Sequence, residues 1–287
     1  MTDRSAPPEI FDAGRRAMAR DRAHMHFANY DFLYRAMFDG LLERMEDVKR
    51  PLEEVLLIGC PDTSARARLE SMGKRVTCCD PGGRNAQANG GVQAQEDALP
   101  FARNSFDLVL ACGTLDSVND LPGALIVAKR VLRPDGLLLA SCIGAGSFGQ
   151  LKRALVAAEQ ESPAPHIHPQ IDIRAAGDLL ARAGFAMPVA DSETLKVRYG
   201  SIMGLMHDLR YMGHGNIMSA KYRGVLSRAT LMRAAGVFAQ AADPDGKTAE
   251  NFVILTMSGW KPDPSQPQPA RRGSGTMSLA DALRAET

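Results

Sequence analysis

Several features that would assign a protein class at once are scarce or missing in this sequence of 287 residues. Charges nearly cancel, with 34 Lys and Arg against 33 Asp and Glu, so the charge balance gives no reason to expect nucleic acid as a partner. No window approaches about 18 uncharged apolar residues, which argues against a membrane-spanning helix. Hydrophobic residues at 45% and charged residues at 23% instead match an ordinary globular protein.

The cysteines form no CxxC pair and no other zinc spacing, so we expect no metal site from them. They lie in apolar, strand-like surroundings, which predicts buried free thiols in a reducing compartment. Residues 1–10 contain Asp3, Glu9 and two prolines in place of the apolar core of a signal peptide. We therefore expect a protein of the cytoplasm, at most peripheral at the inner face of the membrane. The cysteines are Cys60, Cys78, Cys79, Cys112 and Cys142.

Short apolar strands alternate with helical patterns along the chain. Such alternation implies right-handed crossovers and a parallel sheet covered by helices on both faces, which is an α/β fold. Two amphipathic helices come first, at 10–26 and 30–48. We expect strands at 55–58, 75–79, 92–95, 106–111, 137–143, 185–199 and 251–258, and further helices at 62–72, 121–132, 148–161, 174–183, 201–212 and 227–240.

This pattern predicts a division of the chain. Residues 1–50 are expected to form N-terminal helices that pack on a core domain of residues 51–260, with a helical cap at about 148–240. Residues 261–287 are rich in Pro, Gln, Arg, Gly and Ser, so they are expected to form a mobile tail. Four arginines crowd the first helix, and we interpret them as solvated helix surface. They are Arg15, Arg16, Arg20 and Arg22.

Four motifs occur in order in the middle of the chain. Together they resemble the class I, S-adenosylmethionine-dependent methyltransferase pattern, in which "LPF…SFDLV" leads into the fourth strand and "L(R/K)PDG" into the fifth. The resemblance implies a Rossmann-like sheet with N-terminal helices and a C-terminal α/β extension. The motifs are Leu99–Phe101, Ser105–Val109, Val118–Pro122 and Leu132–Gly136.

A narrower resemblance covers nearly the whole chain. It is to the methyltransferase-like assembly factor of respiratory complex I, described as an arginine hydroxylase in mitochondria, which is related to the malonyl-carrier-protein methyltransferase of biotin synthesis. The resemblance implies a protein substrate or a respiratory-chain subunit as partner. The segments that carry it are Ile10–Asp12, Phe106–Val109, Pro165–Pro169, Leu180–Phe185, Asp208–Gly213, Gly259–Lys261 and Arg272–Ser274.

The resemblance also implies S-adenosylmethionine as cofactor, bound beyond the carboxyl ends of the parallel strands. Asp80 matches the acidic residue that accepts hydrogen bonds from ribose hydroxyls, although it also begins an Asp-Pro-Gly-Gly turn. Asp97 and Ala98 match the positions that contact the adenine. Gly59 and Cys112 end the first and fourth strands and complete the expected site. Cys112 has no neighbouring His or Lys, so we interpret it as a packed thiol.

The loop after the first strand departs from the family's pattern of an acidic residue, an apolar residue and then Gly-x-Gly-x-Gly. Only Gly59 matches. Leu57 cannot accept a hydrogen bond from the methionine ammonium, Pro61 lacks an N–H, and Thr63 adds a branched side chain. One lost charge-assisted hydrogen bond weakens binding by roughly 1.5–3 kcal/mol. Asp62 could replace the missing carboxylate, or it could cap the following helix.

Few further side chains are candidates for chemistry. Asp116, after the fourth strand, could orient a nucleophile or act as a base, or it could be an ordinary loop residue. His166 and His168 form a His-x-His pair between two prolines. No Glu or Cys completes a metal set nearby, so we expect this pair to build a loop over the pocket, with no metal bound.

Two functions are consistent with these observations. The first is an S-adenosylmethionine-dependent enzyme that acts on a protein in complex I assembly, by methyl transfer or by arginine hydroxylation. Methyl transfer needs in-line positioning more than a strong base, so few catalytic residues are expected. The second is a non-catalytic assembly protein with a degenerate cofactor loop. The sheet alone implies neither function.

Overall fold

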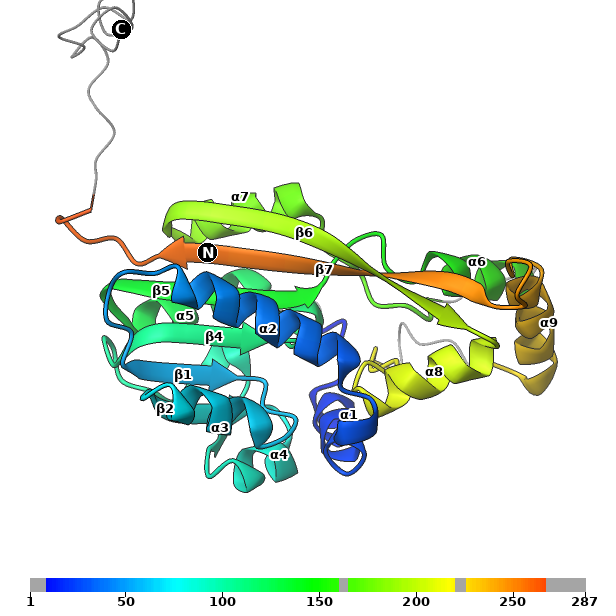
Figure 1. Cartoon of the computed structure of the whole chain (residues 1–287), viewed down its shortest axis with the longest axis horizontal. Coiled ribbons are helices and arrows are strands. Elements are labelled where there is room, and N and C mark those ends of the chain that lie inside the picture. The colour runs from blue at the N-terminus through cyan, green and yellow to red at the C-terminus, as the bar shows by residue number, and fades with distance from the viewer. Residues whose placement is uncertain (1–8, 160–164, 220–225, 267–287) are drawn as a thin grey trace, which may run out of the picture.

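The computed structural model describes residues 9–159, 165–219 and 226–266, and it contains a seven-stranded sheet between layers of helices (Figure 1). The strand order is β3-β2-β1-β4-β5-β7-β6. The first five strands pair in parallel, β7 is antiparallel to β5, and β6 is antiparallel to β7. The predicted α/β class is confirmed. The strands are β1 Glu54–Ile58, β2 Arg75–Asp80, β3 Val92–Gln93, β4 Phe106–Cys112, β5 Leu132–Ile143, β6 Ala186–Tyr199 and β7 Thr248–Trp260.

The helices lie close to their predicted positions, with one addition. The short helix α4 follows the Asp-Pro-Gly-Gly turn, whose turn residues hide it in the sequence. The α-helices are α1 Ala13–His24, α2 Phe32–Glu46, α3 Ser64–Ser71, α4 Gly83–Ala88, α5 Leu121–Val131, α6 Gly149–Ala158, α7 Ile173–Ala183, α8 Ile202–Tyr211 and α9 Arg228–Ala239. Three short 3-10 helices, η1 Phe27–Asn29, η2 Glu96–Ala98 and η3 Leu115–Ser117, lie between them.

Two hydrophobic cores lie on the two faces of the sheet. Alternate residues of β1 point to opposite faces, as strand geometry requires. Leu57 packs on the side of α2 and α3, and Leu56 packs on the side of α5 and α7. Because both sides of β1 are buried, its sequence is a continuous apolar run.

The last two strands extend well beyond the others as an antiparallel ribbon of 14 and 13 residues. Helices α6, α8 and α9 gather around the far end of this ribbon and form the cap (Figure 1). Helix α7 packs instead against β6 and α5, so it covers the sheet. Of the described helices in the cap expected at about 148–240, α6, α8 and α9 therefore lie away from the sheet and α7 covers it; the division of the chain into these parts stays a prediction.

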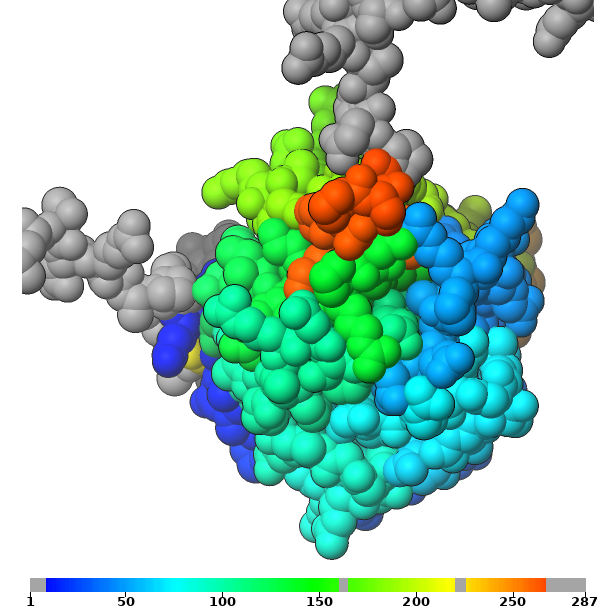
Figure 2. Space-filling view, turned by 90° about the vertical axis from the view of Figure 1, so that its left-hand side faces the viewer, coloured from blue at the N-terminus to red at the C-terminus, as the bar shows by residue number. Residues whose placement is uncertain are grey.

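The segment after β7 stays attached to the sheet as far as Gln266. The backbone N–H of Lys261 donates to Gly136 at 2.8 Å. The amide of Gln266 donates to the carboxylate of Asp135 at 2.8 Å. Figure 2 shows this orange segment lying against the green surface around β5. The rest of the predicted mobile tail, residues 267–287, lies outside the described residues.

The cysteines are free and buried, as predicted. Across residues 9–159, 165–219 and 226–266, no helix has the length and apolar character needed to cross a membrane.

The carboxylate of Glu250, on β7, caps the start of α6. The helix begins after Phe148, whose backbone is left-handed with φ 63° and whose side chain makes no capping hydrogen bond. Glu250 is 1% exposed and accepts hydrogen bonds from the N–H groups of Gln150 at 3.2 Å and Leu151 at 2.8 Å. Its negative charge also meets the positive end of the helix dipole. This contact fixes α6 on the ribbon.

Glu250→Leu is expected to lower the free energy of unfolding by about 1–3 kcal/mol, because two N–H groups in a buried place lose their acceptor. Urea unfolding followed by circular dichroism measures the change. Glu193→Leu, at an exposed position on β6, is the matched control. Equal loss of stability in the two variants would contradict the capping role.

Candidate functional site

Gly59 directly follows β1 and has φ +87°, a left-handed conformation that favours glycine. A Cβ atom there would lie 2.2 Å from the carbonyl oxygen of Cys112, at the end of β4. The Gly59 carbonyl accepts a hydrogen bond from the Tyr34 hydroxyl at 2.6 Å. Packing of the backbone between the strand ends therefore requires this glycine, whether or not a ligand binds.

Asp80 ends β2, is 0% exposed, and has both carboxylate oxygens bonded to neighbours. Arg20, from α1, donates its Nε to Oδ1 at 2.8 Å and its Nη2 to Oδ2 at 2.7 Å. The N–H groups of Gly82 and Cys60 donate to the same oxygens at 2.7 and 2.9 Å. Burial alone would raise the pKa of Asp80, but the Arg20 guanidinium lowers that pKa below its ordinary value. The pair therefore stays ionised.

Arg16, one turn earlier on α1, makes a second buried pair. It donates to both carboxylate oxygens of Glu96, at 2.7 and 2.8 Å, and the two side chains are 4% and 2% exposed. It also donates to the carbonyl of Thr114 at 2.8 Å. The interpretation of the α1 arginines as solvated surface is therefore wrong for Arg16 and Arg20. Two guanidinium groups can be buried here because each meets a carboxylate in bidentate geometry.

The residues expected to contact adenine lie in η2. Asp97 lines a separate cavity of about 130 Å³ together with Phe11 and Asn119, and burial raises the pKa of its carboxyl group. Ala98 is exposed. Glu96, the preceding residue of η2, is the acid that forms an ion pair with α1. A cofactor role for Asp97 and Ala98 stays a prediction.

The altered loop after β1 makes contacts of its own. Asp62 accepts hydrogen bonds from the N–H and the hydroxyl of Ser64, at 3.0 and 2.7 Å, so it forms an Asx-turn just before α3, whose N-cap residue is Thr63. The carbonyl of Pro61 lies 3.0 Å from Nδ1 of His24 on α1. Leu57 is fully buried in the core. These contacts attach the loop to the helices on either side of it.

Helix α1 thus closes the carboxyl ends of the central strands. A cavity of about 10 Å³ lies at these strand ends. Its lining includes Arg20, Tyr34, Pro61 and Gly113. A cavity of that size holds about one water molecule. Pockets for whole small ligands measure about 300–1,000 Å³. The cavity that the described residues leave at the strand ends is therefore far smaller than a nucleoside in this arrangement.

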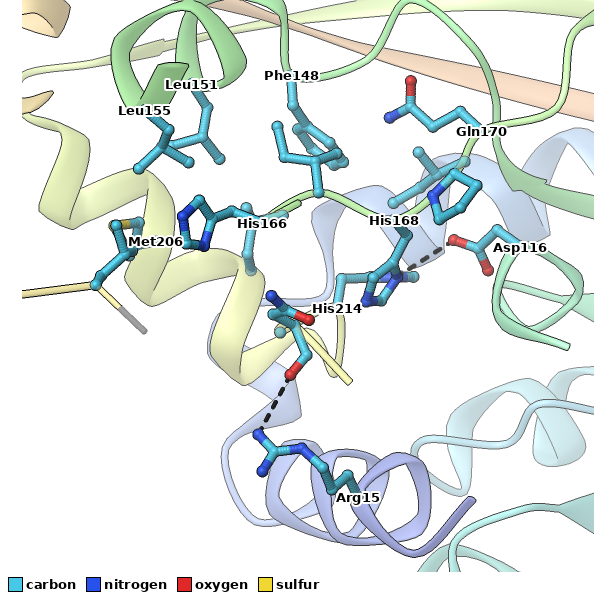
Figure 3. A pocket seen from close by; sticks show the side chains of 17 residues that line it. Arg15, Asp116, Phe148, Leu151, Leu155, His166, His168, Gln170, Met206 and His214 are labelled. Atoms are coloured by element: carbon cyan, nitrogen blue, oxygen red, sulfur yellow. Dashed lines mark hydrogen bonds and ion pairs between the residues drawn. The ribbon is translucent and has the colours of Figure 1, made fainter. Parts of the chain in front are cut away.

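A larger cavity, of about 230 Å³, shares His214 with the small one (Figure 3). Its walls come mainly from η3, α6, α8 and the segments 166–170 and 214–216. Most of the lining is apolar; His168 and His214 lie beside Asp116, whereas His166 and Arg15 lie away from it. The His-x-His pair forms part of this wall and does not line the small cavity at the strand ends, over which it was expected to form a loop. The apolar lining includes Phe148, Leu151, Leu155 and Met206.

Asp116 and two histidines form the polar end of this cavity. The side chain of Asp116 is 8% exposed, and its Oδ2 lies 3.7 Å from Nδ1 of His214. Its Oδ1 is buried without a hydrogen-bond partner in the part of the chain that the structure describes. Nε2 of His168 accepts a hydrogen bond from the N–H of Ile217 at 3.1 Å. The candidate Asp116 is therefore a buried cavity residue.

Both of these histidines are held neutral. Burial lowers the pKa of His168 to about 4, although the carboxylate of Asp116 acts in the opposite direction. Burial also lowers the pKa of His214; the Asp116 carboxylate acts in the opposite direction, and Arg20 and Arg16 add to the lowering. The polar end of the cavity therefore contains one carboxylate beside two neutral rings.

The described residues contain no cluster that suggests metal chemistry. Within residues 9–159, 165–219 and 226–266, no three His, Cys, Asp or Glu side chains gather as a metal site requires. His166 lies with Nε2 2.6 Å from a carboxylate oxygen of Glu159. Cys112 is a packed thiol, as predicted, and burial raises its pKa.

Sequence reasoning missed Arg16, Arg20, Glu96 and His214. The available signal for the arginines was their spacing of four residues, which places them on one face of α1. No local sequence pattern indicates which acids these arginines contact, because the two partners of the Arg16–Glu96 pair are 80 residues apart in the sequence. His214 follows α8 in a loop and carries no pattern at all.

Acidification from about pH 6.5 to about pH 4 is expected to destabilise the protein. Over this range the unfolded chain takes up a proton at His168, whose pKa is 6.5 there, while the folded chain, with a pKa of about 4, does not. The full stability is present above about pH 6.5, and about 3 kcal/mol is lost by pH 4.

His168→Gln, which keeps an acceptor for the N–H of Ile217, is expected to flatten this pH dependence. Thermal unfolding between pH 4 and pH 7 measures it. His26→Gln, outside the cavity, controls for the substitution itself. An unchanged slope in His168→Gln would show that this ring is not the group responsible.

Residues 56–140 match the family described as a methyltransferase domain. The mitochondrial arginine hydroxylase NDUFAF5 of Danio rerio is 33% identical over 286 residues, covering 95% of this chain and 89% of the relative. The malonyl-[acyl-carrier protein] O-methyltransferase of Methylovorus is 29% identical over 276 residues, covering 90% of this chain and 92% of the relative.

Among solved structures, the YcgJ protein from Bacillus subtilis matches with a TM-score of 0.53, at 14% identity, over 78% of this chain and 99% of that chain. At that identity the likeness shows the fold alone. The match to NDUFAF5 extends over nearly the whole chain, well beyond the methyltransferase domain. The chain therefore belongs to the family of the arginine hydroxylase NDUFAF5, built on a methyltransferase-like fold.

Proposed function

We propose that this protein hydroxylates an arginine side chain of a protein during the assembly of respiratory complex I. The relatives named arginine hydroxylase support the reaction, and the sequence resemblance supports the process. Hydroxylation converts a C–H bond into C–O–H: one oxygen atom of dioxygen enters the product, and an electron donor of the cell reduces the other to water. The partner that we propose is a respiratory-chain subunit met in the cytoplasm.

The cavity beside Asp116 is the observation that carries this proposal. Two of the segments by which the chain resembles the arginine-modifying family, 165–169 and 208–213, contribute to its wall. Its volume of about 230 Å³ is below the range of pockets that enclose whole small ligands, and the segment 166–170 separates it from a more open hollow of about 840 Å³ that could receive the rest of a partner chain. We infer that it receives one long side chain from a partner protein.

S-adenosylmethionine is the cofactor that the methyltransferase-like fold implies, but the residues at the strand ends do not fit it in the arrangement described. Both oxygens of Asp80 are bonded to Arg20. Leu57 offers no acceptor, and Pro61 offers no N–H. Binding of this cofactor would require Arg20 to leave Asp80.

Methyl transfer to the same side chain is the second candidate, and the methyltransferase-domain match favours it. The two reactions change the mass of the peptide differently. Methyl transfer replaces one hydrogen of the arginine by a methyl group, a net gain of CH2, whereas hydroxylation is a net gain of one oxygen atom. The mass of the modified peptide therefore distinguishes the two reactions.

Cells that lack this protein are expected to fail to assemble complex I, and one arginine of its subunits is expected to lack the oxygen atom that it carries in normal cells. Native gel electrophoresis measures assembly, and peptide mass spectrometry measures the modification. Return of the gene is the control. If the deletion strain loses complex I but the arginines are unmodified in the deletion strain and in normal cells alike, the protein is a non-catalytic assembly factor and the enzymatic proposal is wrong.

Arg20→Met is expected to bind S-adenosylhomocysteine at least about tenfold more tightly than the wild type. The wild type must first break a charge-assisted bidentate pair, of roughly 1.5–3 kcal/mol, before the carboxylate of Asp80 can meet a ribose. Isothermal titration measures both affinities.

Arg22→Met, at an exposed position on the same helix, is the matched control and should bind as the wild type does. Weaker binding by Arg20→Met than by the wild type would mean that Arg20 assists the ligand and does not block it.

A further inference from the structure

One carboxylate oxygen in the larger cavity lacks a partner from the protein itself. Oδ1 of Asp116 is buried and makes no hydrogen bond to any residue that the structure describes. Its Oδ2 is 3.7 Å from Nδ1 of His214, which is longer than a good hydrogen bond. A buried carboxylate without donors is unfavourable, so a ligand that brings N–H groups to this place is held there.

We propose that Asp116 is the residue that binds the guanidinium group of the substrate arginine. This inference rests on the proposed function and adds the side chain that selects arginine. A guanidinium presents two parallel N–H donors, which match the two oxygens of a carboxylate. The Arg16–Glu96 and Arg20–Asp80 pairs show the same geometry elsewhere in this chain.

The walls of the cavity suit the rest of an arginine side chain. Phe148, Leu151, Leu155 and Met206 come from the cap and present apolar surface (Figure 3). The three methylene groups of an arginine are apolar and are commonly buried against such surface. The charged end then reaches Asp116, on the side of the sheet.

The charges around Asp116 favour one incoming cation. Among the described residues that line the cavity, Asp116 is the only acid. His168 and His214 are neutral rings, so neither supplies the missing positive charge. Arg15 also lines the cavity, but it donates to the carbonyl of Asn216 at 3.4 Å. Figure 3 shows Arg15 at the bottom of the view, well away from Asp116.

The test compares two peptides with the full chain by isothermal titration. The probes are N-acetyl-Gly-Arg-Gly-amide and its citrulline counterpart, which has nearly the same shape and no charge. The wild type is expected to bind the arginine peptide at least about tenfold more tightly than the citrulline peptide. Asp116→Asn, which keeps the shape of the side chain, is expected to remove this preference.

Two further variants complete the design. Asp116→Glu keeps the charge and should retain a preference for the arginine peptide. This variant keeps the test usable if Asp116→Asn does not fold. Asp178→Asn removes an exposed aspartate on α7, outside the cavity, and should bind as the wild type does.

Wild-type protein that binds the two peptides equally, or does not bind the arginine peptide at all, would overturn the assignment. So would an Asp116→Asn variant that retains the preference. Peptide binding as expected, with unmodified arginines in cells, would sink the proposed function and leave the site assignment intact. If cells that carry only Asp116→Asn still contain modified arginines, the proposed function stands and the assignment of Asp116 is wrong.

Discussion

The ion pair between Arg20 and Asp80, with its neighbour between Arg16 and Glu96, is the interaction on which the arrangement around the strand ends depends. The buried residues of α1 are one arginine and two alanines, so polar contacts and not apolar burial set the position of this helix. With α1 in place, the strand ends are closed, and the larger cavity lies beside Asp116. Removal of one partner from a buried pair typically costs about 3–5 kcal/mol. The closed arrangement is therefore held strongly.

The altered loop and the arginines of α1 concern the same place in the molecule. Leu57 and Pro61 remove an acceptor and a donor that a nucleoside cofactor would use, while Asp80 keeps its carboxylate. An acid left alone in that buried position would be unfavourable, and Arg20 supplies the donors that a ribose would otherwise bring. The carbonyl of Pro61 is in turn occupied by His24. Seen together, these changes form one consistent set of internal contacts.

The sequence predicted the sheet well because buried strands are continuous apolar runs that end in turn residues, and β1 and β4 have this pattern. It missed α4, since the preceding Asp-Pro-Gly-Gly masks the start of a helix. Its candidate site was incomplete for another reason. Side-chain pairs such as Arg20–Asp80 join distant segments, and a single sequence carries no record of them. The cavity beside Asp116 likewise depends on how the cap meets the sheet.

Strand β7 belongs both to the sheet and to the cap. At about 3.3 Å per residue, its 13 residues span about 43 Å, whereas the five residues of β1 span about 17 Å. Its last part, Ile254–Trp260, pairs with β5, and its first part carries Glu250 under α6. The cap and the sheet are therefore joined within one hydrogen-bonded strand, without an intervening loop.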